Sequence, residues 1–292
     1  MAPLDFPKLR WAHDQLNGLQ TYGKEWFGGE HHRFTSEPDQ DPAPFRRGNR
    51  AFYVEVDPLP AEFSLRVGEV LQGLRSGLDH LAYALATAHT QPLPDEWAEL
   101  SEFPIFGDES KAGTPGTGSA RFHQASKGGV PVPASGLAKI QGIAPAAQAI
   151  IEGLQPYHRG ADYRDDPLWR LHELSRIDKH RLVHVVAADF DGVGIDTTRS
   201  YNWDWRPGPS MIYAHKGPVE GRTLVGSLPV RPKVGGKKMH VEVVAPFQIA
   251  FGAAVPLVAG DPVISTLGAI HDYIYKRVLK PLVGFLVLPP GL

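Results

Sequence analysis

The sequence has no cysteine, which excludes disulfides, thiolate nucleophiles and zinc ribbons. It also has no run of about 18 apolar residues, the length that a membrane-spanning helix needs. Residues 1–7 lack the basic and then apolar pattern of a signal peptide. We therefore expect a cytoplasmic protein that has no membrane segment.

An excess of charge of one sign is also missing. The chain has 30 Lys and Arg against 32 Asp and Glu, a net charge of −2, and a pI near 6.7. This balance excludes a generally basic surface for nucleic acid, so any RNA contact must be local or made by a groove formed on dimerisation. With 42% hydrophobic and 21% charged residues, the 292-residue chain can bury an ordinary globular core.

Four segments have the apolar spacing of amphipathic helices. They are residues 8–27, 60–88, 166–184 and 262–280, and one or two shorter helices are expected within 136–154. The strongest stripe comprises Phe63, Val67, Val70, Leu71, Leu74, Leu78, Leu81 and Leu85. Pro281 should end or kink the last helix. Residues 111–119, rich in Gly and Thr, predict a surface loop.

Beyond residue 183 the apolar period changes from 3.6 to 2, which indicates strands. We expect strands at 51–56, 183–190, 193–198, 210–214, 222–230 and 239–251. Their short connections predict an antiparallel meander. The predicted fold class is α+β: a helical bundle with an antiparallel sheet in the C-terminal half and a closing C-terminal helix. We expect one domain over 1–292, with a helical part at about 1–184 and 262–287 and a β part at about 183–260. A two-domain division near residue 185 is the alternative.

The helix at 60–88 places several polar groups beside its apolar stripe. Arg75 and Asp79 lie one turn apart and can pair along the helix. Glu69, Ser76 and His80 fall on nearly one meridian opposite the stripe. One interpretation is a solvated face with a helical ion pair, and the other is that Arg75, Asp79 and His80 line a groove.

The helix at 166–184 carries a carboxylate among its apolar positions. Asp178 falls in the middle of a face formed by Leu168, Leu171, Leu174, Leu182 and Val185. A buried carboxylate needs a cation or several donors. Arg75 is the first partner that we expect, and Arg181 or a backbone cap are local alternatives. The two helices should therefore be neighbours, with Leu74, Leu78, Leu171 and Leu174 in one core.

Histidines offer a possible metal site. His180 and His184 have the i,i+4 spacing that can bind a metal on one helix face, and His80, His172 and Glu69 are further candidate ligands. No acidic ligand stands at a fixed offset, so ordinary helix histidines are the alternative. No phosphate loop or nucleophile elbow is present, and we expect no cofactor.

Two stretches, Val67–Ala82 and Leu168–Arg181, resemble a widespread group of uncharacterised bacterial proteins. That group carries an Arg-Ser-x-Leu-Asp-His helix and a later Ile-Asp-Lys-His-Arg helix. The resemblance extends loosely over residues 60–280, including Phe103-Pro-Ile-Phe106. It implies kinship but no activity.

The spacing Arg75-x4-His80 also resembles the Arg-x(4–6)-His motif of the HEPN superfamily of helical ribonucleases and nucleotide-binding proteins. The resemblance implies a homodimer with one composite, metal-independent site. His80 would act as general acid/base on an RNA 2′-hydroxyl or leaving oxygen, and Arg75 would hold the phosphate. The product would be a 2′,3′-cyclic phosphate.

Three functions follow from these residues. The leading hypothesis is a HEPN-like ribonuclease or toxin-type protein, which needs Arg75 and His80 accessible in one groove. The second is a non-catalytic binding or structural module, which needs Arg75 buried and paired with carboxylates. The third is a metal-dependent enzyme, which needs at least three His, Asp or Glu side chains converging on one point.

Overall fold

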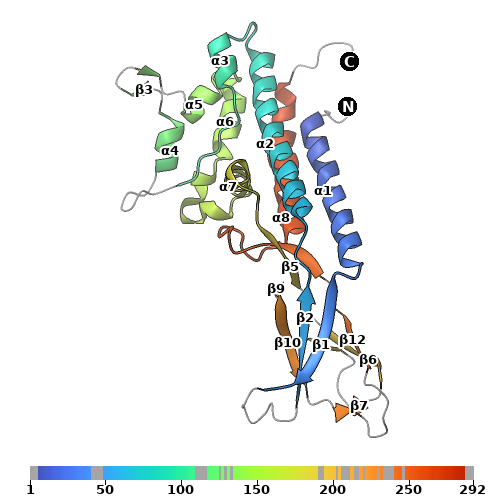
Figure 1. Cartoon of the computed structure of the whole chain (residues 1–292). Helices are drawn as coiled ribbons and strands as arrows, with labels where there is room; N and C mark the ends of the chain where they lie inside the picture. The colour runs from blue at the N-terminus through green and yellow to red at the C-terminus, as the bar shows by residue number, and fades with distance from the viewer. Residues whose placement is uncertain are drawn as a thin grey trace. The chain divides into compact units, whose positions relative to one another are not determined.

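The fold was analysed in a computed structural model of the chain. It describes residues 6–40, 49–108, 117–124, 126–127, 130–131, 134–189, 194–201, 203–204, 211–213, 217–219, 221–228, 231–232, 240–244 and 247–286. Helices and antiparallel strands occupy different stretches of the chain, which confirms the α+β class (Figure 1). None of the helices within these ranges is long and apolar enough to cross a membrane.

The chain divides into two compact units. We call the first the helical unit; it contains Met1–Gly18, Leu65–Val183 and Ser265–Leu292. We call the second the sheet unit; it contains Leu19–Ser64 and His184–Ile264. The expected single domain stays a prediction, because two compact units can unfold together or separately.

Long helices dominate the helical unit, and they begin close to the predicted positions. Helix α1 spans Pro7–Phe27, α2 spans Ala61–His89, α7 spans Pro167–His180 and α8 spans Val263–Tyr273. The shorter elements are α3 (Asp95–Leu100), α4 (Thr117–Phe122), β3 (Ser126–Lys127), β4 (Val130–Pro131), α5 (Gly136–Lys139), α6 (Pro145–Gly153) and η2 (Pro156–Asp165). Of the loop predicted at 111–119, residues 111–116 lie outside the described residues, and residues 117–119 begin α4.

Glycines on α2 allow α1 to approach closely. An ideal Cβ on Gly77 would lie 2.4 Å from Leu9 Cδ2, and one on Gly73 would lie 3.0 Å from the Ala12 Cβ. Because the later residue of α1 meets the earlier glycine of α2, the two helices run antiparallel. On its other side α1 contacts α8, where the rings of His13 and His271 lie 4.9 Å apart.

Helices α2 and α7 are neighbours, as predicted. The side chains of Leu74, Leu78, Leu171 and Leu174 are all 0% exposed, and the Gln72 amide donates to Asp178 across the two helices at 3.2 Å. The apolar stripes that identified the helices in the sequence are therefore the stripes that they bury.

The end of α7 corrects one prediction. The helix stops at His180, because Arg181 adopts an extended backbone (φ −164°, ψ 154°). The expected helical face at Leu182 and Val185 therefore does not form. Leu182 is half-exposed at 50%, and Val185 begins a strand.

The C-terminal helix does not end at Pro281. A π-helical segment, η3 (Ile274–Leu279), follows α8, and short turns α9 (Lys280–Leu282) and η4 (Val283–Phe285) continue beyond it. Proline cannot donate a backbone hydrogen bond, and its ring crowds the preceding turn. The wider π turn before it gives the chain room to continue.

The sheet unit contains three three-stranded antiparallel sheets among the described residues. Their strand orders are β1-β2-β10, β13-β5-β9 and β12-β6-β8, and a small β11-β7 pair accompanies them. The strands are β1 (His32–Pro38), β2 (Arg50–Val56), β5 (Val185–Asp189), β6 (Gly194–Tyr201), β7 (Trp203–Asp204), β8 (Met211–Tyr213), β9 (Gly217–Val219), β10 (Arg222–Leu228), β11 (Arg231–Pro232), β12 (His240–Val244) and β13 (Phe247–Phe251).

Two strand predictions were wrong. The strand expected at 239–251 is two strands in different sheets, and β1 was not among the predicted strands. The pairing is antiparallel throughout but is not a meander, because β2 pairs with β10 and β5 with β13, far along the chain. The sequence predicted the length and alternation of most strands. It did not predict which strands, far apart in the chain, pair with each other.

Candidate functional site

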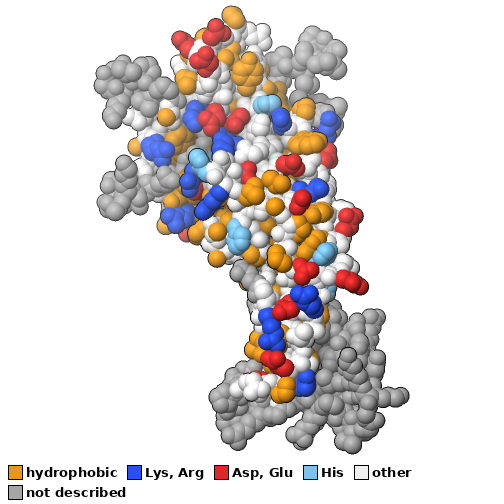
Figure 2. Space-filling view, in the orientation of Figure 1, with side chains coloured by type: hydrophobic (Ala, Val, Ile, Leu, Met, Phe, Trp, Pro, Cys, Tyr) orange, Lys and Arg blue, Asp and Glu red, His pale blue; other side chains and the backbone are white. Residues whose placement is uncertain are grey.

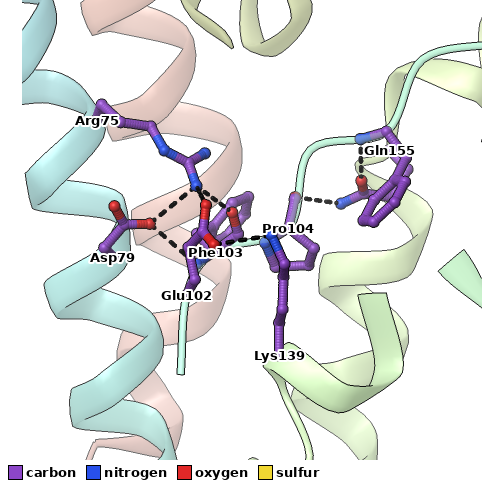
Figure 3. Close-up of polar contacts among 8 residues, drawn as sticks. Arg75, Asp79, Glu102, Phe103, Pro104, Lys139 and Gln155 are labelled. Carbon is purple, nitrogen blue, oxygen red and sulfur yellow. Dashed lines mark hydrogen bonds and ion pairs between the residues drawn. The ribbon is translucent and has the colours of Figure 1, made fainter. Parts of the chain in front are cut away.

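The candidate site is a network of charged side chains around Arg75 on α2. The residue is only 6% exposed, because α2 turns this flank toward the segment 101–106. The guanidinium Nη2 donates to the Phe103 carbonyl at 2.9 Å, pairs with Asp79 Oδ1 at 3.1 Å and bonds the Glu102 carboxylate (Figure 3). The buried cation is thus met by two carboxylates and a peptide oxygen, as a buried charge requires.

Asp79 joins the helix to the neighbouring segment. Its Oδ1 accepts from the Phe103 backbone N–H at 3.1 Å as well as from Arg75. Burial raises the pKa of the Asp79 carboxyl, and nearby Glu102 adds to this, while Arg75 opposes both. Phe103 therefore has both backbone polar groups satisfied by side chains of α2.

Glu102 bridges the two cations of the network. One oxygen bonds Arg75 and the other accepts from Lys139 Nζ at 2.7 Å, so α5 is tied to the same carboxylate. Burial acts to raise the pKa of Glu102, but Lys139 and Arg75 outweigh it and hold the pKa below its ordinary value. We call Arg75, Asp79, Glu102 and Lys139 the Arg75 network; its formal charges cancel.

His172 on α7 faces this network. Burial, followed by the positive charge of Arg75, lowers the pKa of His172 to about 4. The imidazole is therefore neutral at physiological pH, and it can accept or donate a hydrogen bond but carries no charge to the site. Proton donation from an imidazolium at this position would require acidic conditions.

A buried glutamine fixes the segment on its other side. Gln155 accepts from the Phe106 N–H at 3.0 Å, and its Nε2 donates to the Pro104 carbonyl at 3.0 Å and to Ile151 at 2.9 Å. The Phe106 carbonyl in turn accepts from the Tyr157 N–H at 3.1 Å. Residues 103–106 are therefore held between the Arg75 network and Gln155, as Figure 3 shows.

The network also contains a polar atom without a partner among the described residues. Within the network this is Arg75 Nη1; outside it, the hydroxyls of Ser101, which precedes Glu102, and of Ser175 on α7 are likewise buried without a partner among these residues. Buried polar groups that lack a partner are uncommon and call for an explanation such as a water or a ligand.

The predicted Arg75–Asp178 contact is wrong. Asp178 is half-buried and accepts from Gln72, while Arg75 pairs with Asp79 and Glu102. Asp178 lies beside Gly68, where an added Cβ would stand 2.4 Å from its Oδ1. Gly68 and Arg75 are about two turns, or roughly 10 Å, apart along α2. The cation is satisfied instead by Asp79 on its own helix and by Glu102 and Phe103 in the segment beside it.

Arg75 and His80 do not share a surface within one chain. His80 and Glu69 are exposed, in agreement with their predicted place opposite the stripe, whereas Arg75 is buried. His180 is exposed at the end of α7. His184 lies beyond that helix, against Gly252, so the predicted i,i+4 pair of histidines does not form. Across the described ranges, no group of three or more His, Cys, Asp or Glu is placed to hold a metal ion.

Sequence reasoning missed Glu102, Lys139 and Gln155. The sequence analysis noted the neighbouring tetrapeptide Phe103–Phe106 only as part of a resemblance, although its apolar side chains in a polar stretch could have indicated a buried segment. Glu102, directly before this segment, was a reasonable candidate for the partner of a buried cation. The sequence could not show that its partner lies on α2.

No protein-family model, no curated protein and no solved structure matches the chain.

Proposed function

We propose that this chain is a non-catalytic binding or structural module whose helical unit is organised by the Arg75 network. The observation that carries the proposal is the enclosure of the Arg75 guanidinium by Asp79, Glu102 and the Phe103 carbonyl. An arginine that stabilises a phosphate must offer its donors to the ligand. Here the Nη2 donors are already engaged, and the side chain is 8% exposed.

The position of His80 supports the same proposal. His80 follows Arg75 by five residues, and each residue turns the helix by about 100°. After one full turn is subtracted, the His80 side chain points about 140° away from that of Arg75. His80 is exposed while Arg75 faces the interior. One chain therefore offers no groove in which both side chains could act on the same phosphate. We also propose that the protein is cytoplasmic, as expected from a sequence that has no cysteine.

The test is an RNA-cleavage assay on the full chain with fluorescent single-stranded RNA in EDTA. We expect no cleavage by the wild type and no difference between it and His80→Ala. Cleavage in EDTA that His80→Ala abolishes, with an unchanged melting temperature, would overturn the proposal. Cleavage that needs a divalent metal would overturn it too, in favour of a metal-dependent enzyme.

A HEPN-like ribonuclease that acts on RNA or a nucleotide as a homodimer is the second candidate. Two observations favour it: His80 is open to solvent, and Arg75 Nη1 has no partner in the described part of the chain. This function requires a second copy to bring the two groups together. Any EDTA-resistant cleavage should then increase with protein concentration in parallel with the dimer fraction measured by light scattering.

A further inference from the structure

A cavity opens in the helical unit between α3, α5 and α6, and none of its lining residues belongs to the Arg75 network. Its volume is about 580 Å³, and it is lined by Glu96, Trp97, Leu100, Ser135, Leu137, Ala138, Gln141 and Gln148. Cavities of roughly 300–1,000 Å³ with apolar walls and a few polar groups are the usual size of small-molecule sites. The lining of this cavity has both kinds of group.

The lining has one charged side chain, the Glu96 carboxylate, beside the polar side chains of Ser135, Gln141 and Gln148. Gln148 Nε2 donates to the carbonyls of Ile140 at 3.0 Å and Ile143 at 2.7 Å, which leaves its Oε1 for another partner. Glu96 contributes an exposed carboxylate. None of the described lining residues is Lys, Arg or His, and neighbouring Lys139 directs its Nζ to Glu102. The cavity therefore suits a donor that carries positive charge.

The apolar part of the lining includes an aromatic ring. Trp97, which follows Glu96 on α3, is half-buried, and Leu100 and Leu137 complete an apolar wall. Tryptophan is the best aromatic partner for a cation. Because Glu96 and Trp97 both line the cavity, a carboxylate and an indole ring are both available to an ammonium group there, and the leucines can contact an apolar body.

The surroundings strengthen this preference. Asp95, Glu96 and Glu99 are all exposed on α3, and Figure 2 shows acidic side chains gathered over this helix. A concentration of one sign of charge beside a cavity raises the local concentration of the opposite ion. Cations are favoured at the mouth of the cavity and anions are repelled.

We propose that this cavity binds a small organic ammonium compound, a primary amine with an apolar body. The ammonium group lies between the Glu96 carboxylate and the Trp97 ring, and the body packs on Leu100 and Leu137. This site is separate from the Arg75 network. Its occupancy neither requires nor excludes RNA cleavage, so the two proposals fail independently.

The probe is 2-phenylethylamine, compared with its neutral analogue 2-phenylethanol and the anion 3-phenylpropionate. Binding to the full chain is measured by titration calorimetry and by saturation-transfer NMR at low salt. We expect the amine to bind, and to bind at least about fivefold more tightly than the alcohol, the difference that one close charge contributes in water. The carboxylate should bind least.

Paired variants test the residues. Glu96→Gln should weaken amine binding about fivefold without changing alcohol binding. Glu99→Gln is the matched control on the same helix outside the lining, and it should change affinity less than about twofold. Trp97→Leu should weaken amine binding more than Glu96→Gln does. If Trp97→Leu does not fold, Glu96→Gln and its control decide the question.

Three results would overturn the proposal. They are no binding of the amine to the folded wild-type chain, equal binding of amine, alcohol and carboxylate, and equal effects of Glu96→Gln and Glu99→Gln on amine binding.

Discussion

Two charged side chains, Arg75 on α2 and Asp178 on α7, are accommodated beside α2 in different ways. At Arg75 a buried charge is enclosed by charged groups and a backbone carbonyl from a separate segment. About two turns earlier, Gly68 makes room for Asp178, which stays half-buried and accepts a single neutral hydrogen bond from Gln72. The difference teaches that depth decides the kind of partner. A deep charge needs countercharge, while a shallower one can use solvent and an amide.

The largest expected effect is at Arg75. Arg75→Ala leaves Asp79 and Glu102 without their common cation, and we expect a loss of about 3 kcal/mol in the free energy of unfolding, the lower end for a broken buried pair. The lower end applies because the Glu102 side chain is 42% exposed. Urea denaturation measures the change.

The control for this variant is Arg176→Ala on α7. Arg176 pairs with Glu173 at 2.7 Å, but its side chain is 57% exposed. Surface pairs contribute about 0–1 kcal/mol. Equal losses in the two variants would mean that the Arg75 network is no more than a surface pair.

The second prediction concerns acid. The pKa of His172 is lowered to about 4 from an ordinary 6.5, so the unfolded chain binds the proton more readily than the folded one. Its contribution to stability is complete above pH 6.5 and is lost as pH falls toward 4. The full difference in pKa would correspond to about 3 kcal/mol over this window, and because His172 is only partly buried we expect wild type to lose about 2 kcal/mol more than His172→Gln.

His80→Gln is the control for this prediction. His80 is exposed, so its removal should leave the pH profile of stability unchanged. Parallel profiles for wild type and His172→Gln, measured by urea denaturation at several pH values, would show that the His172 imidazole is solvated.

The smallest effect is expected at Gly68. A Cβ there would meet Asp178 Oδ1 at 2.4 Å, so Gly68→Ala should lower stability by about 1–2 kcal/mol through overpacking. Asp178→Ala alone should lower it by about 1 kcal/mol, the value of one hydrogen bond.

The double variant should be more stable than Gly68→Ala, because the clash is then removed. Additive losses would show that the two residues do not interact.

The fold was predictable where the information is local. The stripe from Phe63 to Leu85 identified α2 to within a residue or so, and the Asp166-Pro167 start identified α7, where Asp166 accepts from the Leu168 N–H at 2.8 Å. Strand β1 was missed because its side chains lack a clean alternation of apolar and polar types. Its order comes from pairing with β2 along its whole length.

The candidate site was predictable only in part. Arg75 and Asp79 were expected to pair, and they do, at 3.1 Å, because i,i+4 spacing is a local property. The remaining partners come from residues 27 and 64 positions further along, at Glu102 and Lys139, and no period in the sequence reports such a contact. The end of α7 at His180 was also misplaced, since apolar Leu182 and Val185 continued the helical spacing by coincidence.

The segment 103–106 is held at one end by the Arg75 network and at the other by Gln155, and these two sets of contacts respond differently to pH. The Glu102 end depends on ionisation and weakens when acid protonates that carboxylate. The Phe106 end depends on Gln155, whose amide both accepts and donates as a peptide group does in a β-ladder. A carboxylate at position 155 could only accept, so an amide is required there, and neither pH nor salt alters it. We therefore expect acid to weaken the attachment at Glu102 while the hydrogen bonds of Gln155 to Pro104 and Phe106 remain.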